Sequence, residues 1–369
     1  MKLSNIAQNW TRNKKNTYVK GGNDFDGFLR LDIGEPWFPL TPDLERTLGN
    51  LSVDDFKKRP DIHCLKLRNA ASKFWNVPAE NIVVANGSDQ FIWLLPRLFM
   101  NPADNAIVIN PTFFLFSESV TRVAGKVISF TTSLSNKFEA TEQIISDVIN
   151  TANQNSVKII WLCNPNNPTG SAISLDKILK IVKNTSALVI VDEAFFDISD
   201  LTTSESALSL VNKHTNIVVL KTMSKTFGLN NVRVGFTIAN KELTKILEDW
   251  KLPFEVSHIA QEVGSVVLND VVHWRKMKQA LLTERDWVIN KIGEIKSIEL
   301  ASPTKTTIFL IRKNEGDIFK LLLNKNILVS NFNICKGIED MGFARITVKS
   351  RAENTKLISV LKKIDDCVI

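Results

Sequence analysis

Cysteine is scarce in this sequence, and no two cysteines form a CxxC pair. The four thiols, Cys64, Cys163, Cys335 and Cys367, are scattered over 369 residues. This spacing argues against a disulfide framework and against a zinc site, and it favours reduced thiols in a cytoplasm. We therefore expect a cytoplasmic protein with no metal centre.

Long apolar runs are also missing. No run reaches the ~18–20 residues that a membrane-spanning helix needs. Residues 1–16 include several basic side chains but lack the apolar segment that follows them in a secretory signal. The sequence therefore predicts neither a secretory signal nor a membrane partner.

Basic residues are in excess, but they are not clustered. The formal net charge is +7, from 46 lysines and arginines against 39 acidic residues. The lysines are spread along predicted helices, so we expect no nucleic-acid partner, and a cationic surface suits anionic small molecules as well. The length allows one large domain and a smaller one, each with its own core.

The stretch 220–236, LKTMSKTFGLNNVRVGF, carries the strongest chemical signal. Lys225 lies just after a predicted strand, where an amine can meet a carbonyl group and form a Schiff base. Thr222, Ser224 and Arg233 are residue types that bind a dianionic phosphate. Taken alone, the stretch fits either a phosphate-bearing aldehyde tethered to lysine or an ordinary polar turn with surface lysines.

Polar side chains follow several other predicted strands. Strands alternate with helices as far as residue 238, which is typical of a mostly parallel sheet covered on both faces. In such sheets ligands bind at the carboxyl ends of the strands. Ser88, Asn167, Asp192 and Lys225 each follow a predicted strand closely, so one pocket can hold all four.

A glycine–serine turn precedes a predicted helix that starts at Asp89. Gly87 and Ser88 form this turn after the strand predicted at 82–85. Free N–H groups and the helix dipole make such a turn an anion site. The alternative is a plain helix N-cap, because serine and aspartate cap helices in many proteins.

The character of the chain changes after residue 241. Helices are predicted over 241–250 and 257–292, strands within 298–311 and 344–349, and a closing helix over 354–364. We expect an α/β fold with three parts: an N-terminal arm (1–35), a large domain (36–245) and a small α+β domain (246–369) that packs with the arm.

Three ordered blocks resemble the signatures of the fold-type I, pyridoxal-phosphate-dependent aminotransferases of class I/II: CNPNNPTG (163–170), VDEAF (191–195) and TMSKTFGLNNVRVGF (222–236). NGSDQ (86–90), PTFFLF (111–116) and ARITV (344–348) resemble weaker blocks of the same family. Order and approximate spacing agree over nearly the whole chain. Within the family, the sequence most resembles the histidinol-phosphate aminotransferases and the threonine-phosphate decarboxylases. The resemblance implies a large domain built on a seven-stranded-type sheet.

The resemblance implies pyridoxal 5'-phosphate (PLP) as cofactor and assigns two catalytic residues. Lys225 would carry PLP as a Schiff base and then move the α-proton of the substrate. Lys221 is the rival lysine, and the family pattern makes it a structural or surface residue. Asp192 would pair with the pyridine nitrogen and keep it protonated.

The other cofactor contacts are implied in the same way. Asn167 would hydrogen-bond the ring 3′-oxygen, whereas Asn164 and Asn166 would form the turn. Phe113 would stack on the ring, although core packing explains this phenylalanine equally well. The phosphate would be held by residues of the turn and of the lysine stretch: Gly87, Ser88, Asp89, Thr222, Ser224 and Arg233.

Substrate contacts would come from both ends of the chain. Arg345 would clamp the α-carboxylate in a bidentate fork, the alternative being a surface arginine on a strand. Gly34, in LDIGEP, would offer a backbone contact to the same carboxylate. This LDIGEP block looks more like the general class I opening than like the histidinol-phosphate aminotransferases. His258 falls where the family's helix approaches the neighbouring site, so it is a candidate substrate contact.

The sequence departs from the family at two positions. Phe195 stands where aminotransferases of the family usually have a tyrosine, in a chain whose only tyrosine is Tyr18 against 21 phenylalanines. Without that hydroxyl we expect the pKa of the Schiff-base nitrogen to be raised. Arg59, before Pro60, replaces a tyrosine that reaches the neighbouring subunit's phosphate, and it would make that contact with a full charge or be a surface residue.

Three functions follow. The first is ping-pong transamination of an amino acid or an amino-alcohol phosphate with a 2-oxo acid, in a homodimer. The second is decarboxylation, β/γ-elimination or cyclisation; GGN at 21–23 resembles the decarboxylase motif, with Lys20 in place of its histidine. The third is a non-catalytic regulator of the same fold, which would need an additional DNA-binding domain that the sequence lacks.

Overall fold

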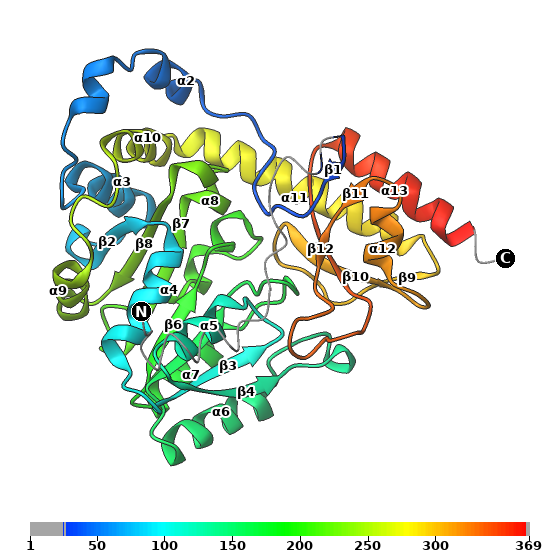
Figure 1. The fold of residues 1–369 in the computed structure, drawn as a ribbon, viewed down its shortest axis with the longest axis horizontal. Coiled ribbons are helices and arrows are strands. Elements are labelled where there is room, and N and C mark those ends of the chain that lie inside the picture. Colours follow the sequence, from blue (N-terminus) through cyan, green and yellow to red (C-terminus); the bar gives the residue numbers. More distant parts are fainter. Residues whose placement is uncertain (1–24, 26, 367–369) are drawn as a thin grey trace, which may run out of the picture.

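The computed structural model describes residue 25 and residues 27–366, and its two larger β-sheets lie side by side (Figure 1). The larger sheet lies with the helices α3 to α10, and the smaller one lies beneath the long helix α11 and the closing helix α13. The motifs at 20–23, together with Tyr18 and Cys367, lie outside the described residues. No described helix is both long enough and apolar enough to cross a membrane.

The larger sheet has seven strands in the order β2-β8-β7-β6-β5-β3-β4. Only β8 runs antiparallel to its neighbours, so the expected mostly parallel α/β sheet is confirmed. Its strands are β2 (Ile82–Asn86), β3 (Asn105–Asn110), β4 (Lys126–Thr131), β5 (Ile159–Cys163), β6 (Leu188–Asp192), β7 (Ile217–Thr222) and β8 (Val234–Ala239).

Helices cover both faces of this sheet, because the central strands are apolar on both sides. One face packs against α3 (Leu65–Trp75), α6 (Glu142–Gln154), α7 (Leu175–Asn184) and α10 (His258–Asn269). The other packs against α4 (Ser88–Phe99), α5 (Leu115–Arg122) and α9 (Lys241–Trp250). Burial of both faces of a parallel sheet leaves its carboxyl edge as the place where polar side chains gather.

The smaller sheet is antiparallel, in the order β12-β13-β10-β9. Its strands are β9 (Ile298–Leu300), β10 (Ile308–Lys313), β12 (Ser330–Asn331) and β13 (Ala344–Thr347). It shares a core with α11 (Val271–Gly293), α12 (Ile318–Leu323) and α13 (Arg351–Asp366).

A segment near the N-terminus joins this second core. The short strand β1 (Leu29–Arg30) pairs in parallel with β11 (Ile327–Leu328), and Leu31 is fully buried among the residues of the smaller sheet. The chain then crosses to α2 (Pro42–Gly49). The division at residues 35 and 245 stays a prediction; α10 packs with the larger sheet.

The single helix predicted over 257–292 is wrong. Asp270, with φ −90° and ψ 65°, separates α10 from α11. Its carboxylate accepts hydrogen bonds from the His273 N–H (3.0 Å) and from the Thr41 hydroxyl (2.6 Å). An N-cap aspartate with a partner far away in sequence therefore overrides the continuous helical pattern.

A buried ion network lies at the end of β7. Lys221 is 1% exposed, and its Nζ lies 2.7 Å from Glu193 Oε2 and 3.2 Å from Asp197 Oδ1. Thr226, in the short helix α8 (Met223–Thr226), donates to Asp197 as well. Although burial favours the neutral amine, Asp197 and Glu193 outweigh it and raise the pKa of Lys221. The network thus ties the end of β7 to the loop after β6 and to α8.

Replacement of Lys221 by methionine should destabilise the protein by ~3–5 kcal/mol, because it leaves Glu193 and Asp197 as uncompensated buried charges. Chemical unfolding at neutral pH measures this loss. The matched control is Lys126→Met, which changes an exposed lysine on the edge strand β4 and should cost less than ~0.5 kcal/mol. If Lys221→Met lowers the free energy of unfolding by less than ~1 kcal/mol, the network does not stabilise the fold appreciably.

Candidate active site

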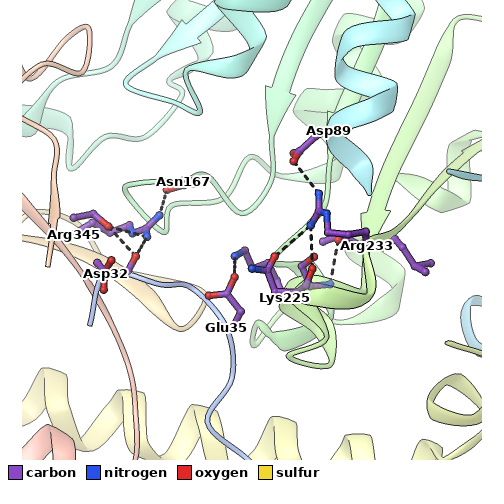
Figure 2. A network of polar contacts seen from close by, with 12 residues as sticks. Asp32, Glu35, Asp89, Asn167, Lys225, Arg233 and Arg345 are labelled. Carbon is purple, nitrogen blue, oxygen red and sulfur yellow. Dashed lines mark hydrogen bonds and ion pairs between the residues drawn. The ribbon is translucent and has the colours of Figure 1, made fainter. Parts of the chain in front are cut away.

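The carboxyl edge of the larger sheet gathers most of the predicted site residues. Lys225 lies on α8, directly after β7. Asp192 is the last residue of β6, Asn167 follows β5, and Ser88 begins α4 after β2. Arg345, from β13 of the smaller sheet, lies beside Asn167 on the side of the site opposite Arg233 (Figure 2).

Lys225 has a carboxylate as its nearest partner. Its Nζ lies 2.5 Å from Oε1 of Glu35, which reaches it from the loop that crosses between the two sheets (Figure 2). Burial lowers the pKa of Lys225, and Glu35 opposes this effect. The Lys225 side chain is 24% exposed, so it is desolvated but not fully closed off from solvent.

Asp192 is a buried carboxyl group. It is 4% exposed, and its Oδ1 accepts a hydrogen bond of 2.9 Å from the Ala194 N–H. Burial raises its pKa to about 7, and the charge of Asp89 adds to the effect. Such a group binds a proton or a positively charged N–H donor strongly when one is offered.

A glycine–serine turn links the end of β2 to the start of α4. Gly87 has φ +82°, and a Cβ there would lie 2.6 Å from Nη2 of Arg233. A Cβ on Gly235 would lie 2.1 Å from the backbone nitrogen of Ser88. Both glycines let the turn, the helix N-terminus and the guanidinium come together, and the first N–H groups of a helix suit an anion.

Arg233 and the residues around Lys225 complete this turn. Arg233 adopts φ 55° and places its Nη2 3.2 Å from Oδ2 of Asp89. The side-chain oxygen of Thr222 accepts the Ser224 N–H at 3.2 Å, and both residues are buried. The predicted phosphate ligands therefore lie around one turn.

The loop after β5 holds Asn167 in place. Asn164 exchanges two hydrogen bonds with the backbone of Ile173, and Asn166 bonds the Thr112 hydroxyl and the carbonyl of Pro111. The side chains of Asn164 and Asn166 are thus used within the loop. Asn167 instead accepts a hydrogen bond of 2.8 Å from Nη1 of Arg345.

Arg345 is buried, with 9% exposure, and it is held by three acceptors. Besides Asn167, it donates to the carbonyl of Asp32 and to Ser330 Oγ (3.0 Å). Its Nε is buried and has no hydrogen-bond partner among the described residues. Desolvation lowers the pKa of Arg345 to about 10.

Gly34 and Phe195 pack against each other beside Lys225. A Cβ on Gly34 would lie 3.1 Å from Cζ of Phe195 and 3.5 Å from Cε of Lys225. Phe195 is 3% exposed. The edge of the Phe195 ring and the end of the Lys225 side chain therefore both lie close to Gly34.

Three predicted residues have other surroundings. The ring of Phe113 makes edge contacts with Phe114 and Phe116. Arg59 is exposed, and its guanidinium carbon lies 5.3 Å from the ring centre of Phe254. His258 is partly buried at the start of α10. Among the described residues, neither Arg59 nor His258 has a hydrogen bond to the group around Lys225.

Two charged residues of the site are not predicted from the sequence. Glu35 follows Gly34 in the LDIGEP block, for which the sequence predicts only the backbone contact of Gly34. Lys349 lies four residues after Arg345, and its Nζ donates to the carbonyl of Glu35 at 2.9 Å. Even spacing along an extended segment, at positions 345, 347 and 349, is the signal that could have indicated Lys349.

Known proteins of one family resemble this chain along almost its whole length. Residues 27–361 match the family of class I and II aminotransferases. The histidinol-phosphate aminotransferase of Ruminiclostridium cellulolyticum is 30% identical over 339 residues, which cover 91% of this chain and 92% of the relative.

Solved structures show the same fold. The histidinol-phosphate aminotransferase of Sinorhizobium meliloti, solved with pyridoxal-5'-phosphate, has a TM-score of 0.85 at 14% identity, covering 100% of this chain and 98% of its own. The L-threonine-O-3-phosphate decarboxylase of Porphyromonas gingivalis has a TM-score of 0.77 at 20% identity, covering 91% and 99%. The fold and the sequence match together establish that the chain belongs to the aminotransferase class I and II family.

Proposed function

We propose that this chain transfers an amino group between an amino acid or amino-alcohol phosphate and a 2-oxo acid by a ping-pong route. As a class I/II aminotransferase, it is a PLP-dependent transferase. The observation that carries the proposal is the position of Lys225, a desolvated amine that lies with a buried carboxyl group and an anion-binding turn at one sheet edge.

The side chains at this edge fit PLP. The raised pKa of Asp192 suits a carboxyl group that faces a protonated ring nitrogen. The turn at Gly87 and Ser88, with Thr222, Ser224 and Arg233, offers donors for a phosphate. Asn167 would hydrogen-bond the ring oxygen, and Phe113 would pack on the ring. When bound, PLP supplies an electron sink for the bonds at the substrate's α-carbon.

Each residue then has one task. Lys225 would take the proton from the α-carbon of the substrate and return it, which requires an amine that is neutral near pH 7. The lowered pKa of Lys225 favours that state. Arg345 would bind the α-carboxylate through its guanidinium, with the backbone of Gly34 as a second contact.

Decarboxylation, with elimination or cyclisation, is the second candidate. Phe195 supports it, because the threonine-phosphate decarboxylases also have phenylalanine there. The similarity in fold to the Porphyromonas gingivalis decarboxylase is compatible with it. The bond that breaks is the one held perpendicular to the ring, and the substrate-facing side chains decide this. The regulator hypothesis has no comparable support in the site.

A cytoplasmic homodimer is part of the proposal. Val53, Phe56 and Phe254 are large apolar side chains with exposures of 74%, 71% and 45%. Apolar surface of this kind suits a partner subunit. Arg59, which lies over Phe254, and His258, at the start of α10, would then reach the site of the partner subunit.

A substrate screen tests the proposed reaction. The pure protein loaded with PLP is mixed with candidate amino acids and amino-alcohol phosphates, and its visible spectrum and products are followed. Transamination predicts loss of the visible band without carbon dioxide, and return of the band when a 2-oxo acid is added. Carbon dioxide release with the band retained would instead establish decarboxylation, and no response to any compound would favour the regulator.

Phe195→Tyr tests the departure at the aromatic position. The new hydroxyl would extend from Cζ of Phe195, which lies close to Gly34, as does Cε of Lys225. It should lower the pKa of the Lys225 nitrogen in the PLP-loaded protein by ~1 unit, because it stabilises the neighbouring ring oxygen as an anion. A pH titration of the visible band measures this pKa.

The matched control for this titration is Phe56→Tyr, which adds a hydroxyl to an exposed ring. It should leave the titration where it is. An unchanged or raised pKa in Phe195→Tyr would contradict the role assigned to the missing hydroxyl.

A further inference from the structure

We propose that Glu35 is the counter-ion of Lys225, a positioning residue whose carboxylate opposes the loss of the proton from the lysine nitrogen and so raises the pH at which the amine can react. This inference deepens the proposed function and rests on it for its meaning. The contact between Glu35 and Lys225 is nevertheless open to a test that needs no cofactor.

Contacts with Lys225 and Lys349 fix the position of Glu35. Its Oε1 lies 2.5 Å from Nζ of Lys225, and its side chain keeps 14% exposure. Its Oε2 is buried and has no hydrogen-bond partner among the described residues. The main chain at Glu35 is fixed too, since Lys349 donates to its carbonyl at 2.9 Å.

Other charged groups that face Lys225 come from two further elements. Arg345 on β13 lowers the pKa of Lys225, whereas Asp89 on α4 raises it. Asp89 lies beside Arg233, at 3.2 Å, so part of its charge is balanced there. Lys349, after β13, faces the backbone of Glu35, and its own pKa is lowered by burial. Glu35 is therefore the carboxylate that acts most directly on the amine.

The nearby carboxylate of Asp32 is used elsewhere. Both of its oxygens accept hydrogen bonds from Arg30, at 2.7 and 2.8 Å. Figure 2 shows Asp32 beside Arg345 and Glu35 beside Lys225, although both acids belong to the same loop. This loop thus offers two carboxylates with different partners, and only Glu35 is aimed at the reactive nitrogen.

This arrangement has a chemical consequence. An ammonium group must first lose a proton before its nitrogen can attack an aldehyde carbon. The nitrogen then forms a double bond to that carbon, and the aldehyde oxygen leaves as water with the two hydrogens of the neutral amine. Because Glu35 stabilises the ammonium form, this reaction requires a higher pH than it would without Glu35. Removal of its charge should speed the reaction below the pKa of Lys225.

The first measurement follows the amine itself. The full chain without PLP is treated with trace acetic anhydride between pH 6 and pH 11, and acetylation of Lys225 is quantified by peptide mass spectrometry. Glu35→Gln should increase the rate by ~10-fold or more at neutral pH, which corresponds to a pKa lower by at least ~1 unit. The two rates should converge at high pH, where both proteins carry a neutral amine.

Asp32→Asn is the matched control, because it removes one charge from the same loop but from a carboxylate that pairs with Arg30. It should leave the profile of Lys225 in place. Glu35→Asp is the second variant. Its shorter side chain keeps the charge but moves it away from Lys225, so its acetylation profile should lie between those of wild type and Glu35→Gln. Thermal unfolding verifies that each variant is folded.

An unchanged profile in Glu35→Gln, or an equal shift in Asp32→Asn, would overturn the inference. The second measurement, the rate at which added PLP attaches to the chain, should shift with pH as acetylation does. If acetylation shifts but PLP never attaches to wild type, the ion pair is established and the proposed function fails. If PLP attaches but neither profile shifts, the proposed function stands and the role of Glu35 is refuted.

Discussion

Two lysines lie four residues apart, Lys221 at the end of β7 and Lys225 in α8, and the rest of the site depends on how differently the fold surrounds them. Lys221 points into the core and is neutralised by Glu193 and Asp197. Lys225 points to the carboxyl edge, where it keeps partial exposure and a single close carboxylate. A buried amine stays charged when carboxylates pair with it fully, whereas desolvation without full pairing lowers its pKa. In the proposed function Lys221 therefore serves stability and Lys225 serves the chemistry.

Charged and polar contacts at the site connect the smaller sheet with the larger one. The loop that contains Asp32, Gly34 and Glu35 leaves the core of the smaller sheet at Leu31 and reaches α8 of the larger sheet. Arg345 donates hydrogen bonds to the carbonyl of Asp32 and to the side chain of Asn167. A substrate carboxylate that binds Arg345 must therefore enter at the contact between the two sheets. Substrate binding and the mutual position of the sheets are for this reason linked in the proposed reaction.

Much of this site could be predicted from sequence because parallel strands end at a common edge. That rule alone brought Asn167, Asp192 and Lys225 together, and the three signature blocks indicated the family. Glu35 was not predicted, because nothing local in the sequence tells which way the side chains of a loop between two sheets point. Lys349 was not predicted because it lies beyond the end of β13, where only its even spacing after Arg345 indicates it. The prediction of a single helix over 257–292 is wrong for a similar reason. The helix ends at Asp270, whose carboxylate accepts a hydrogen bond from the hydroxyl of Thr41, a residue distant in sequence. Contacts within one element or at a shared sheet edge could be predicted from the sequence, whereas contacts between segments distant in sequence could not.

Lys225 as the point of PLP attachment is the central claim, and borohydride trapping tests it most directly. Reduction of the PLP-loaded protein fixes the cofactor on the lysine that holds it, and peptide mass mapping then locates that lysine. We expect the added mass on the peptide segment that contains Lys225, with fragment ions assigning it to that residue. Attachment to Lys221 or to any other lysine would refute the role of Lys225 as the PLP-binding lysine.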